Sequence, residues 1–265
     1  MTPPGPSPRV DRFPTPGPDA HWSAAPGRVP PASADEVHVW RFTLDPPEPA
    51  LARFDPTLDD EERRRRDRFR TETLRRRFLA GRGSLRSILG AYLGCPAVEV
   101  AFAYGLHGKP RLADATAGVP PVEFNLAHSH GLALCAVTLG REVGVDVEAV
   151  RAFDNSERII DRFFSPREQA DFLALPEADR LAAFFRGWSR KEAFLKATGT
   201  GLSTRLDSFD VTLGPVAALL RVGDDPSEAP LWSLLDLHPG PGFAAAVATR
   251  GGGFEVRLWD GLPGT

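Results

Sequence analysis

The sequence predicts an α+β protein, because segments with strand and helix patterns follow one another in blocks along its 265 residues. One strand pattern comes first, followed by two helices, a group of strands, a long helical stretch and a last group of strands. This order recurs roughly twice, with an Ala-, Gly- and Pro-rich stretch at 113–121 between the two parts. We therefore expect two α+β halves, at residues 36–118 and 119–265.

The first 35 residues differ in composition from the rest of the chain. They hold ten of the 26 prolines, mixed with Gly, Ser and Ala. Proline donates no backbone hydrogen bond and interrupts both helices and strand ladders. We therefore expect a disordered tail over residues 1–35, and a first half-buried strand in the alternating segment EVHVWRFTL at 36–44.

Two helices are predicted next. The first is short, with Thr57 as its N-cap and acidic residues in its first turn. The second has an apolar stripe at three- and four-residue steps and is expected to end at Gly94 and Pro96. The stripe is formed by Leu74, Phe78, Leu85, Leu89 and Tyr92.

The remaining elements follow from alternation and from turn residues. A helical region is expected over 156–196, with breaks near Pro166 and Pro176. Strands are expected at 98–103, 123–129, 132–139 and 143–148, and near 208–213, 217–222, 230–237, 243–249 and 254–259.

Composition excludes several classes of function. The net charge of −3 gives no overall attraction to nucleic acid or to an anionic membrane. No apolar run is long enough to span a bilayer, and the first residues lack the pattern of a signal peptide. Cys95 and Cys135 have no metal-binding spacing and are expected to be two buried thiols rather than a disulfide. A cytoplasmic protein is expected.

Residues 61–86 carry eleven arginines against four acidic residues. A basic run of this kind indicates a solvated helix face, a nucleic-acid surface or a phosphate-binding site. No aromatic side chain is placed for stacking on bases, because Phe69 falls at a core position. The pattern therefore favours a small phosphorylated ligand over nucleic acid.

Three acidic residues suggest a metal site. In VGVDVE, strand alternation puts Asp146 and Glu148 on the face opposite the three valines. Glu192 belongs to a predicted helix whose same face carries Trp188 and Lys196. If this helix packs beside the strand, three carboxylates converge, and Mg²⁺ takes such ligands together with water and phosphate. An isolated D-x-E pair would more often be a pair of surface acids.

Only three of the 32 Lys and Arg residues are lysines, namely Lys109, Lys191 and Lys196. An ammonium group is a compact movable charge, whereas a guanidinium is a rigid fork. Lys109 lies between Gly108 and Pro110 in a predicted tight loop. A strand-edge loop could also offer His128 and Ser129 to a phosphate.

Several motifs together resemble a known family, over about residues 58–213. They are RRRFLAGRGSLRSILGAYLG, FAYGLHGKPRL, FNLAHSHG, VGVDVE, FFSPREQADF and WSRKEAFLKATGTGL, in this order. The string resembles the 4′-phosphopantetheinyl transferases of the surfactin-synthetase-activating type. Each motif is short, and the specificity lies in their order and spacing.

The resemblance implies a holo-[acyl-carrier-protein] synthase activity. Such an enzyme transfers the 4′-phosphopantetheine arm of coenzyme A to a serine of an apo acyl or peptidyl carrier protein and releases adenosine 3′,5′-bisphosphate. The implied fold is a pseudo-dimer of two similar α+β halves, with the active site, coenzyme A and Mg²⁺ in the cleft between them. A cytoplasmic monomer serving polyketide, peptide or fatty-acid synthesis is expected, with no nucleic-acid or membrane partner.

The resemblance also implies roles for individual residues. Asp146, Glu148 and Glu192 match the metal ligands, and Lys196 matches a lysine near the pyrophosphate. The expected cofactor-binding residues are Arg65, Arg77, Lys109, Pro110, His128, Ser129 and Lys196. Many relatives have serine at the position of Ala127, so one phosphate contact is expected to be absent.

Catalysis is expected to depend on two of these residues. Glu192 or a metal-bound water would take the serine proton, and Lys196 would stabilise the departing nucleotide. Lys191 would either help to receive the acidic carrier protein or face solvent. Two alternatives stay open: a metal-dependent phosphodiesterase or nuclease with the same acids, and a coenzyme A-binding protein without turnover.

Overall fold

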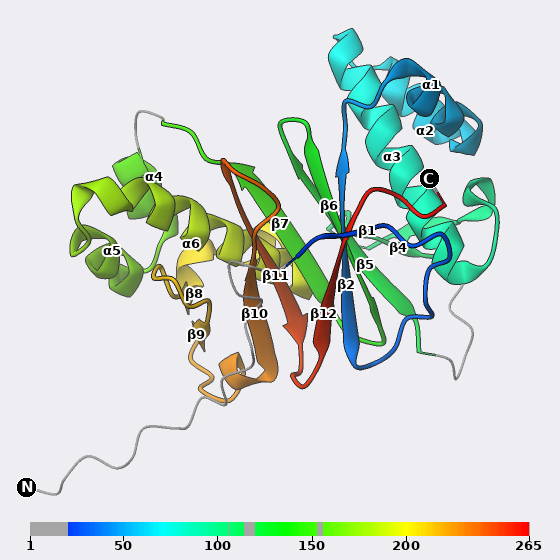
Figure 1. Cartoon of the computed structure of the whole chain (residues 1–265). Coiled ribbons are helices and arrows are strands. Elements are labelled where there is room, and N and C mark those ends of the chain that lie inside the picture. Colours follow the sequence, from blue (N-terminus) through cyan, green and yellow to red (C-terminus); the bar gives the residue numbers. More distant parts are fainter. Residues whose placement is uncertain (1–20, 106, 114–119, 153–155, 265) are drawn as a thin grey trace, which may run out of the picture.

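The structure is a computed structural model that describes residues 21–105, 107–113, 120–152 and 156–264 (Figure 1). Its helices are α1 Glu48–Leu51, α2 Asp60–Asp67, α3 Glu72–Leu93, α4 Ser156–Phe163, α5 Pro166–Leu173 and α6 Glu177–Thr198. Short 3-10 turns lie at Ala52–Thr57, Ala97–Glu99, Gly201–Ser203, Leu206–Ser208 and Ala229–Leu231. Together with the strands, they confirm the predicted α+β class.

The strands form two larger sheets and two small ones. The five-stranded sheet has the order β1 (Ser23–Ala24), β12 (Glu255–Asp260), β2 (Glu36–Thr43), β6 (Leu132–Leu139) and β5 (Val122–Ser129). The three-stranded sheet has the order β10 (Trp232–Leu237), β11 (Phe243–Arg250) and β7 (Val143–Ala149). The small sheets pair β3 (Phe102–Tyr104) with β4 (Pro110–Leu112) and β8 (Phe209–Val211) with β9 (Leu219–Val222).

The two larger sheets meet in the middle of the molecule, with helices on either side (Figure 1). Valines and leucines from both sheets share one buried cluster, which includes Val39, Val145, Val247 and Leu258. Helix α3 packs on the five-stranded sheet through Leu85 and Leu89, whereas α6 packs against β7 and β11. The valines of β7 lie on the face that contributes to this cluster, which explains their alternation with other residues along the strand.

The five-stranded sheet combines strands from both sides of the boundary expected between residues 118 and 119. β5, β6 and β12 come after that boundary, yet β6 and β12 pair directly with β2. Residues 114–119, in which the boundary falls, lie outside the described residues. The sheet order follows from long-range pairing, which local sequence patterns do not specify.

The expectation of a disordered tail does not hold for residues 21–35. β1 pairs in parallel with β12, and the indole nitrogen of Trp22 donates to the backbone oxygen of His238 at 2.7 Å. Val29 is buried in the core beneath α3. Aromatic and apolar side chains therefore order part of a proline-rich segment. Residues 1–20, the rest of the expected tail, lie outside the described residues.

Most predicted elements are confirmed, and the differences have local causes. Asp59 rather than Thr57 caps α2, in a reciprocal capping box with Glu62. Gly94 ends α3 with a φ of 68°, as predicted. Leu74 is exposed although it was expected in the apolar stripe, because it lies in the first turn of α3. Of the expected 98–103 strand only residues 102 and 103 belong to one, as part of β3 (Phe102–Tyr104), since residues 97–99 form a 3-10 turn.

The two cysteines and the hydrophobicity of the helices bear on two further predictions. Both cysteines are free, with Cys135 buried and Cys95 half-buried. Burial raises the pKa of the Cys135 thiol above its ordinary value. Within the described residues, no helix combines the length and the hydrophobicity that a membrane crossing requires.

Lys191 neither faces solvent nor is available to a partner, so that prediction is wrong. Its side chain is fully buried on α6 and donates to both oxygens of Glu168 at 2.7 Å and to the backbone oxygen of Phe209 at 2.8 Å. Glu168 also accepts from the backbone nitrogens of Val211 and Ser165. The pair therefore joins α5, α6 and β8. Burial lowers the pKa of Lys191 and raises that of Glu168, while each charge opposes the shift of the other.

Replacement of Lys191 with methionine should destabilise the fold severely. Lys191→Met leaves the buried carboxylate of Glu168 without its counter-charge, which should lower the free energy of unfolding by about 3–5 kcal/mol. Urea denaturation followed by circular dichroism would measure the loss. Arg205→Met is the matched control, because Arg205 pairs with Asp207 on the exposed surface and should leave the midpoint unchanged. Equal midpoints for Lys191→Met and wild type would contradict a stabilising role for this pair.

Candidate active site

Strand β7 separates apolar and acidic side chains as the sequence predicts. Val143, Val145 and Val147 are buried between the two larger sheets. Asp146 and Glu148 therefore lie on the opposite face of the strand, toward α6. The pattern of the sequence alone sets this separation.

Helix α6 contacts β7 through backbone atoms at Gly144. A Cβ atom at Gly144 would lie 2.1 Å from the carbonyl oxygen of Ala193 and 2.2 Å from the amide nitrogen of Ala197. Real side chains do not approach a backbone this closely, so only glycine allows the observed spacing. Glu192 and Lys196 belong to the same part of α6, which brings them to the acidic face of β7.

Lys196 contacts the buried carboxylate of Asp146. Its Nζ atom donates to Asp146 Oδ1 at 2.6 Å, and the lysine side chain remains 30% exposed. The other oxygen, Asp146 Oδ2, is the one buried side-chain polar atom of the described chain without a hydrogen-bond partner. A buried carboxylate oxygen of this kind has the unused lone pairs that a cation or a donor could bind.

Burial and neighbouring carboxylates raise the pKa of Glu148 and that of Glu192. Burial and then the charge of Asp146 raise the pKa of Glu148, although a hydrogen bond from Ser129 Oγ at 2.9 Å opposes the shift. Burial, followed by the charges of Asp146 and Glu148, also raises the pKa of Glu192, while Lys196 lowers it. Asp146 and Glu148 share one face of β7, and α6, which packs against this strand, carries Glu192 four residues before Lys196.

The donor set fits a hard divalent cation, although the ligands are not arranged around a common point. Among the described residues, no three His, Cys, Asp or Glu side chains are grouped closely enough to hold a metal. Lys196 instead neutralises one oxygen of Asp146. Such a cation would give Asp146 Oδ2 the partner it lacks. It would also stabilise the charged forms of Glu148 and Glu192, whose pKa values are raised. Magnesium therefore stays a prediction.

Lys109 differs from the expectation of a phosphate-binding side chain. Its Nζ atom donates to two backbone carbonyl oxygens, that of Val143 at 3.0 Å and that of Ala197 at 3.1 Å. Burial lowers the pKa of Lys109, and the nearby charges of Glu123 and Glu142 oppose the shift. Two of its three protons are thus used within the protein. Pro110, the next residue, opens β4 opposite Tyr104.

His128 and Arg77 lie near the acidic site. Partial desolvation, then the charge of Lys196 and that of Arg77 lower the pKa of His128, whose side chain is exposed at the end of β5. Arg77, on α3, makes a bidentate pair with Asp45 at 2.8 and 2.7 Å. Its charge is therefore already matched in part.

Arg65 and Ser129 have other surroundings than expected. Arg65, on α2, lies over the ring of Phe78 at 5.6 Å, and it has no contact with the other predicted site residues in the described structure. The hydroxyl of Ser129 is used within the protein, since it donates to Glu148 and accepts from the amide of Ala149 at 3.1 Å. It orients a carboxylate instead of pointing to an open pocket.

Sequence reasoning missed Asn125, Gly144 and the backbone of His130. Asn125 Oδ1 accepts a hydrogen bond from the buried amide of Val145 at 2.9 Å. A polar residue flanked by Phe124 and Leu126 in a predicted strand was the available signal. Among the described residues, His130 is the one non-glycine residue with positive φ, at 56°, in the two-residue turn between β5 and β6.

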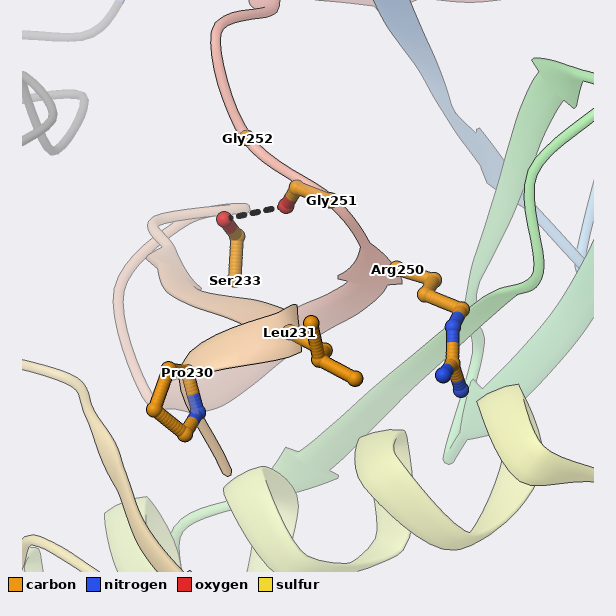
Figure 2. Close-up of a pocket in the computed structure, with 6 residues that line it drawn as sticks. All are labelled: Pro230, Leu231, Ser233, Arg250, Gly251 and Gly252. Atoms are coloured by element: carbon orange, nitrogen blue, oxygen red, sulfur yellow. Dashed lines mark hydrogen bonds between the residues drawn. The ribbon is translucent and has the colours of Figure 1, made fainter. Parts of the chain in front are cut away.

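A separate pocket of about 280 Å³ lies at the far end of β10 and β11 (Figure 2). Ser233 and Arg250 line it, and Ser233 donates to the carbonyl of Gly251 at 2.7 Å. Asp146 pairs instead with Ala246, four residues before Arg250. The pocket contains no acid, histidine or lysine, so the acidic site has the stronger chemical case.

Comparison with known proteins gives a consistent result. Residues 142–248 match the family model described as the 4′-phosphopantetheinyl transferase superfamily. The chain is 44% identical over 227 residues to the 4′-phosphopantetheinyl transferase HetI of Nostoc sp., covering 85% of this chain and 92% of the relative. It is 33% identical to the 4′-phosphopantetheinyl transferase Sfp of Bacillus subtilis, covering 61% of this chain and 69% of the relative.

The resemblance to solved structures is weaker. A holo-[acyl-carrier-protein] synthase from Thermotoga maritima aligns with a TM-score of 0.33 and 24% identity. The alignment covers 42% of this chain and 62% of the other. The matched family segment contains β7 and α6, and with them the three acids and Lys196.

Gly144 offers a direct test of the packing that holds this site. Gly144→Ala should lower the free energy of unfolding by about 2–3 kcal/mol, because the new methyl group meets the α6 backbone, which cannot move aside. Urea denaturation would measure the change. Gly214→Ala is the control, since an added Cβ there has no neighbour within 4 Å. Similar stabilities of the two variants would show that β7 and α6 can separate without cost.

Proposed function

Because this chain belongs to the 4′-phosphopantetheinyl transferase superfamily, we propose that it transfers the 4′-phosphopantetheine arm of coenzyme A to a serine of an apo acyl or peptidyl carrier protein. The observation that carries the proposal is the 44% identity over 92% of a relative named for this activity. Three carboxylates beside a lysine support it chemically, since phosphoryl transfer depends on positioned charge more than on covalent catalysis.

The reaction exchanges one phosphorus–oxygen bond for another. The serine hydroxyl of the carrier attacks the β-phosphorus of the coenzyme A pyrophosphate. The bond from this phosphorus to the bridging oxygen breaks, and adenosine 3′,5′-bisphosphate leaves with the bonding electrons. The serine proton must be accepted, and negative charge on the leaving phosphate must be stabilised.

Glu192 and Lys196 are suited to these two tasks. The raised pKa of Glu192 makes it a stronger base than an ordinary glutamate, and no hydrogen bond to its carboxylate is found among the described residues. Lys196 uses one proton for Asp146 and keeps two for phosphate oxygens. We assign to Glu192 the role of accepting the serine proton and to Lys196 the role of stabilising the departing nucleotide.

Asp146, Glu148 and Glu192 would together hold Mg²⁺, and the ion would supply charge neutralisation on the phosphoryl oxygens. Asp146 Oδ2 is buried without a partner, which supports its use as a ligand. Ser129 fixes the orientation of Glu148 for the same purpose. Among the protein's own groups, Asp146 also holds Lys196 at the edge of the acids.

We assign nucleotide binding to His128, on which the charges of Lys196 and Arg77 both act, and to Arg77. Pro110 and Arg65 stay predicted contacts of the nucleotide. A pseudo-dimer of two α+β halves stays part of the proposal, although the five-stranded sheet takes strands from both sides of the expected boundary. We also propose that the protein is a cytoplasmic monomer. Fatty-acid, polyketide and peptide carriers all present the required serine.

A mass assay tests the transfer directly. The protein is incubated with coenzyme A, Mg²⁺ and a panel of purified apo carrier proteins. We expect at least one carrier to gain the mass of one phosphopantetheine group, with release of an equal amount of adenosine 3′,5′-bisphosphate. Release of the bisphosphate without modification of any carrier would instead indicate a hydrolase. Tight coenzyme A binding without either product would indicate a binding protein.

Glu192→Gln should reduce the transfer rate by at least about 100-fold, because it removes both the base and one metal ligand while preserving the shape of the side chain. The rate of carrier modification at saturating coenzyme A measures the effect. Glu142→Gln is the matched control, since Glu142 is exposed just before β7 and should retain full activity. A rate within twofold of wild type for Glu192→Gln would remove this residue from catalysis.

A further inference from the structure

Strand β7 has a sheet partner on one edge only. Its even-numbered residues exchange ladder bonds with β11, where Asp146 faces Ala246 and Glu148 faces Ala244. Its odd-numbered residues turn their backbone groups to the other edge, because N–H and C=O of one residue point the same way in an antiparallel ladder. A buried strand edge needs hydrogen-bond partners.

Side chains supply those partners. Asn125 accepts from the amide of Val145, and Ser129 accepts from the amide of Ala149, both from the neighbouring strand β5. At the first residue of β7, Lys109 donates to the carbonyl of Val143 on the same edge. The acidic strand is therefore held at both ends of its free edge.

Lys109 alone among these three side chains also reaches α6. Its second bond goes to the carbonyl of Ala197, in the last turn of the helix. The last four carbonyls of a helix lack helical partners and carry the negative end of its dipole, so an ammonium group is favourable there. One cation thus joins the strand of Asp146 to the helix of Glu192 and Lys196.

The backbone of Lys109 makes a hydrogen bond of its own. The backbone nitrogen of Gly105 donates to the carbonyl of Lys109 at 3.0 Å, and Gly108 has a φ of 79° that favours glycine. The methylene stem of Lys109 lies against Gly199, where an added Cβ would come within 3.4 Å of Lys109 Cδ. The ammonium nitrogen of Lys109 thus reaches both carbonyl oxygens from a supported stem.

We propose that Lys109 is a positioning residue that sets the spacing of the acidic strand and helix, and that it does not bind the 3′-phosphate of coenzyme A. The proposal rests on the proposed function for its kinetic consequence. At Gly144 the backbone of β7 contacts that of α6 at Ala193 and Ala197, and Lys109 ties the carbonyls of Val143 and Ala197 at the same junction. Lys109 therefore reinforces the contact on which the spacing of the two elements depends.

Coenzyme A and 3′-dephospho-coenzyme A distinguish positioning from phosphate binding. Lys109→Met keeps the apolar stem and removes the donors. Its kcat should fall by about 10- to 100-fold with both substrates, as for loss of a residue that orients metal ligands. The Mg²⁺ concentration for half-maximal rate should rise in parallel. His128→Ala provides the contrast, because it should lose more activity with coenzyme A than with the dephosphorylated form.

Amide hydrogen exchange gives a readout that does not depend on activity. In Lys109→Met, residues 143–149 and the end of α6 should exchange faster, while β2 should exchange as in wild type. Arg111→Met, an exposed change two residues away on β4, should alter neither exchange nor rate. If Lys109→Met does not fold, Lys109→Gln, which keeps one donor group, should show the same changes to a smaller extent.

Two results would overturn the proposal. One is a loss of activity with coenzyme A that is absent with 3′-dephospho-coenzyme A, which would assign Lys109 to the phosphate. The other is unchanged exchange over residues 143–149. Failure of the wild-type protein to modify any carrier would reject the proposed function, yet the exchange comparison would still decide whether Lys109 fastens β7 to α6.

Discussion

The direct contact between the backbones of β7 and α6 is the constraint on which the site depends. At Gly144 no side chain separates strand from helix, so the two elements lie closer than ordinary packing allows. This proximity brings Asp146 within 2.6 Å of Lys196 and places Glu192 in the field of two other carboxylates. Charges of one sign are held together only because the surrounding core is rigid.

The two edges of β7 are hydrogen-bonded in different ways. A ladder to β11 satisfies one edge, and Asn125, Ser129 and Lys109 satisfy the other. Side-chain bonds of this kind let the acidic strand sit beside β5 without joining its sheet. Ser129 connects this edge to the chemistry, because the hydroxyl that accepts from Ala149 also donates to Glu148.

The three lysines place a compact cation in three different surroundings. Lys191 is enclosed with Glu168 in the core, Lys109 spans two carbonyl groups, and Lys196 contacts a carboxylate at the partly exposed edge of the acids. For Lys191 and Lys109 a single nitrogen donates to several oxygens, whereas Lys196 donates to one oxygen of Asp146. A planar guanidinium presents its donors as a fork and suits the bidentate pairs that the arginines form elsewhere, such as Arg77 with Asp45.

The sequence by itself determined the class of fold, most of the element positions and the shared strand face of Asp146 and Glu148. Alternation and helical periodicity are local, and a D-x-E pattern fixes which side chains share a strand face. The order of the motifs also determined the family. Only the tertiary structure decided that Lys191 is buried, that Lys109 binds backbone and that β1 extends the sheet. These outcomes depend on which distant elements meet. The same lysine side chain can face solvent, form a buried ion pair or join two backbone segments, according to what packs against it.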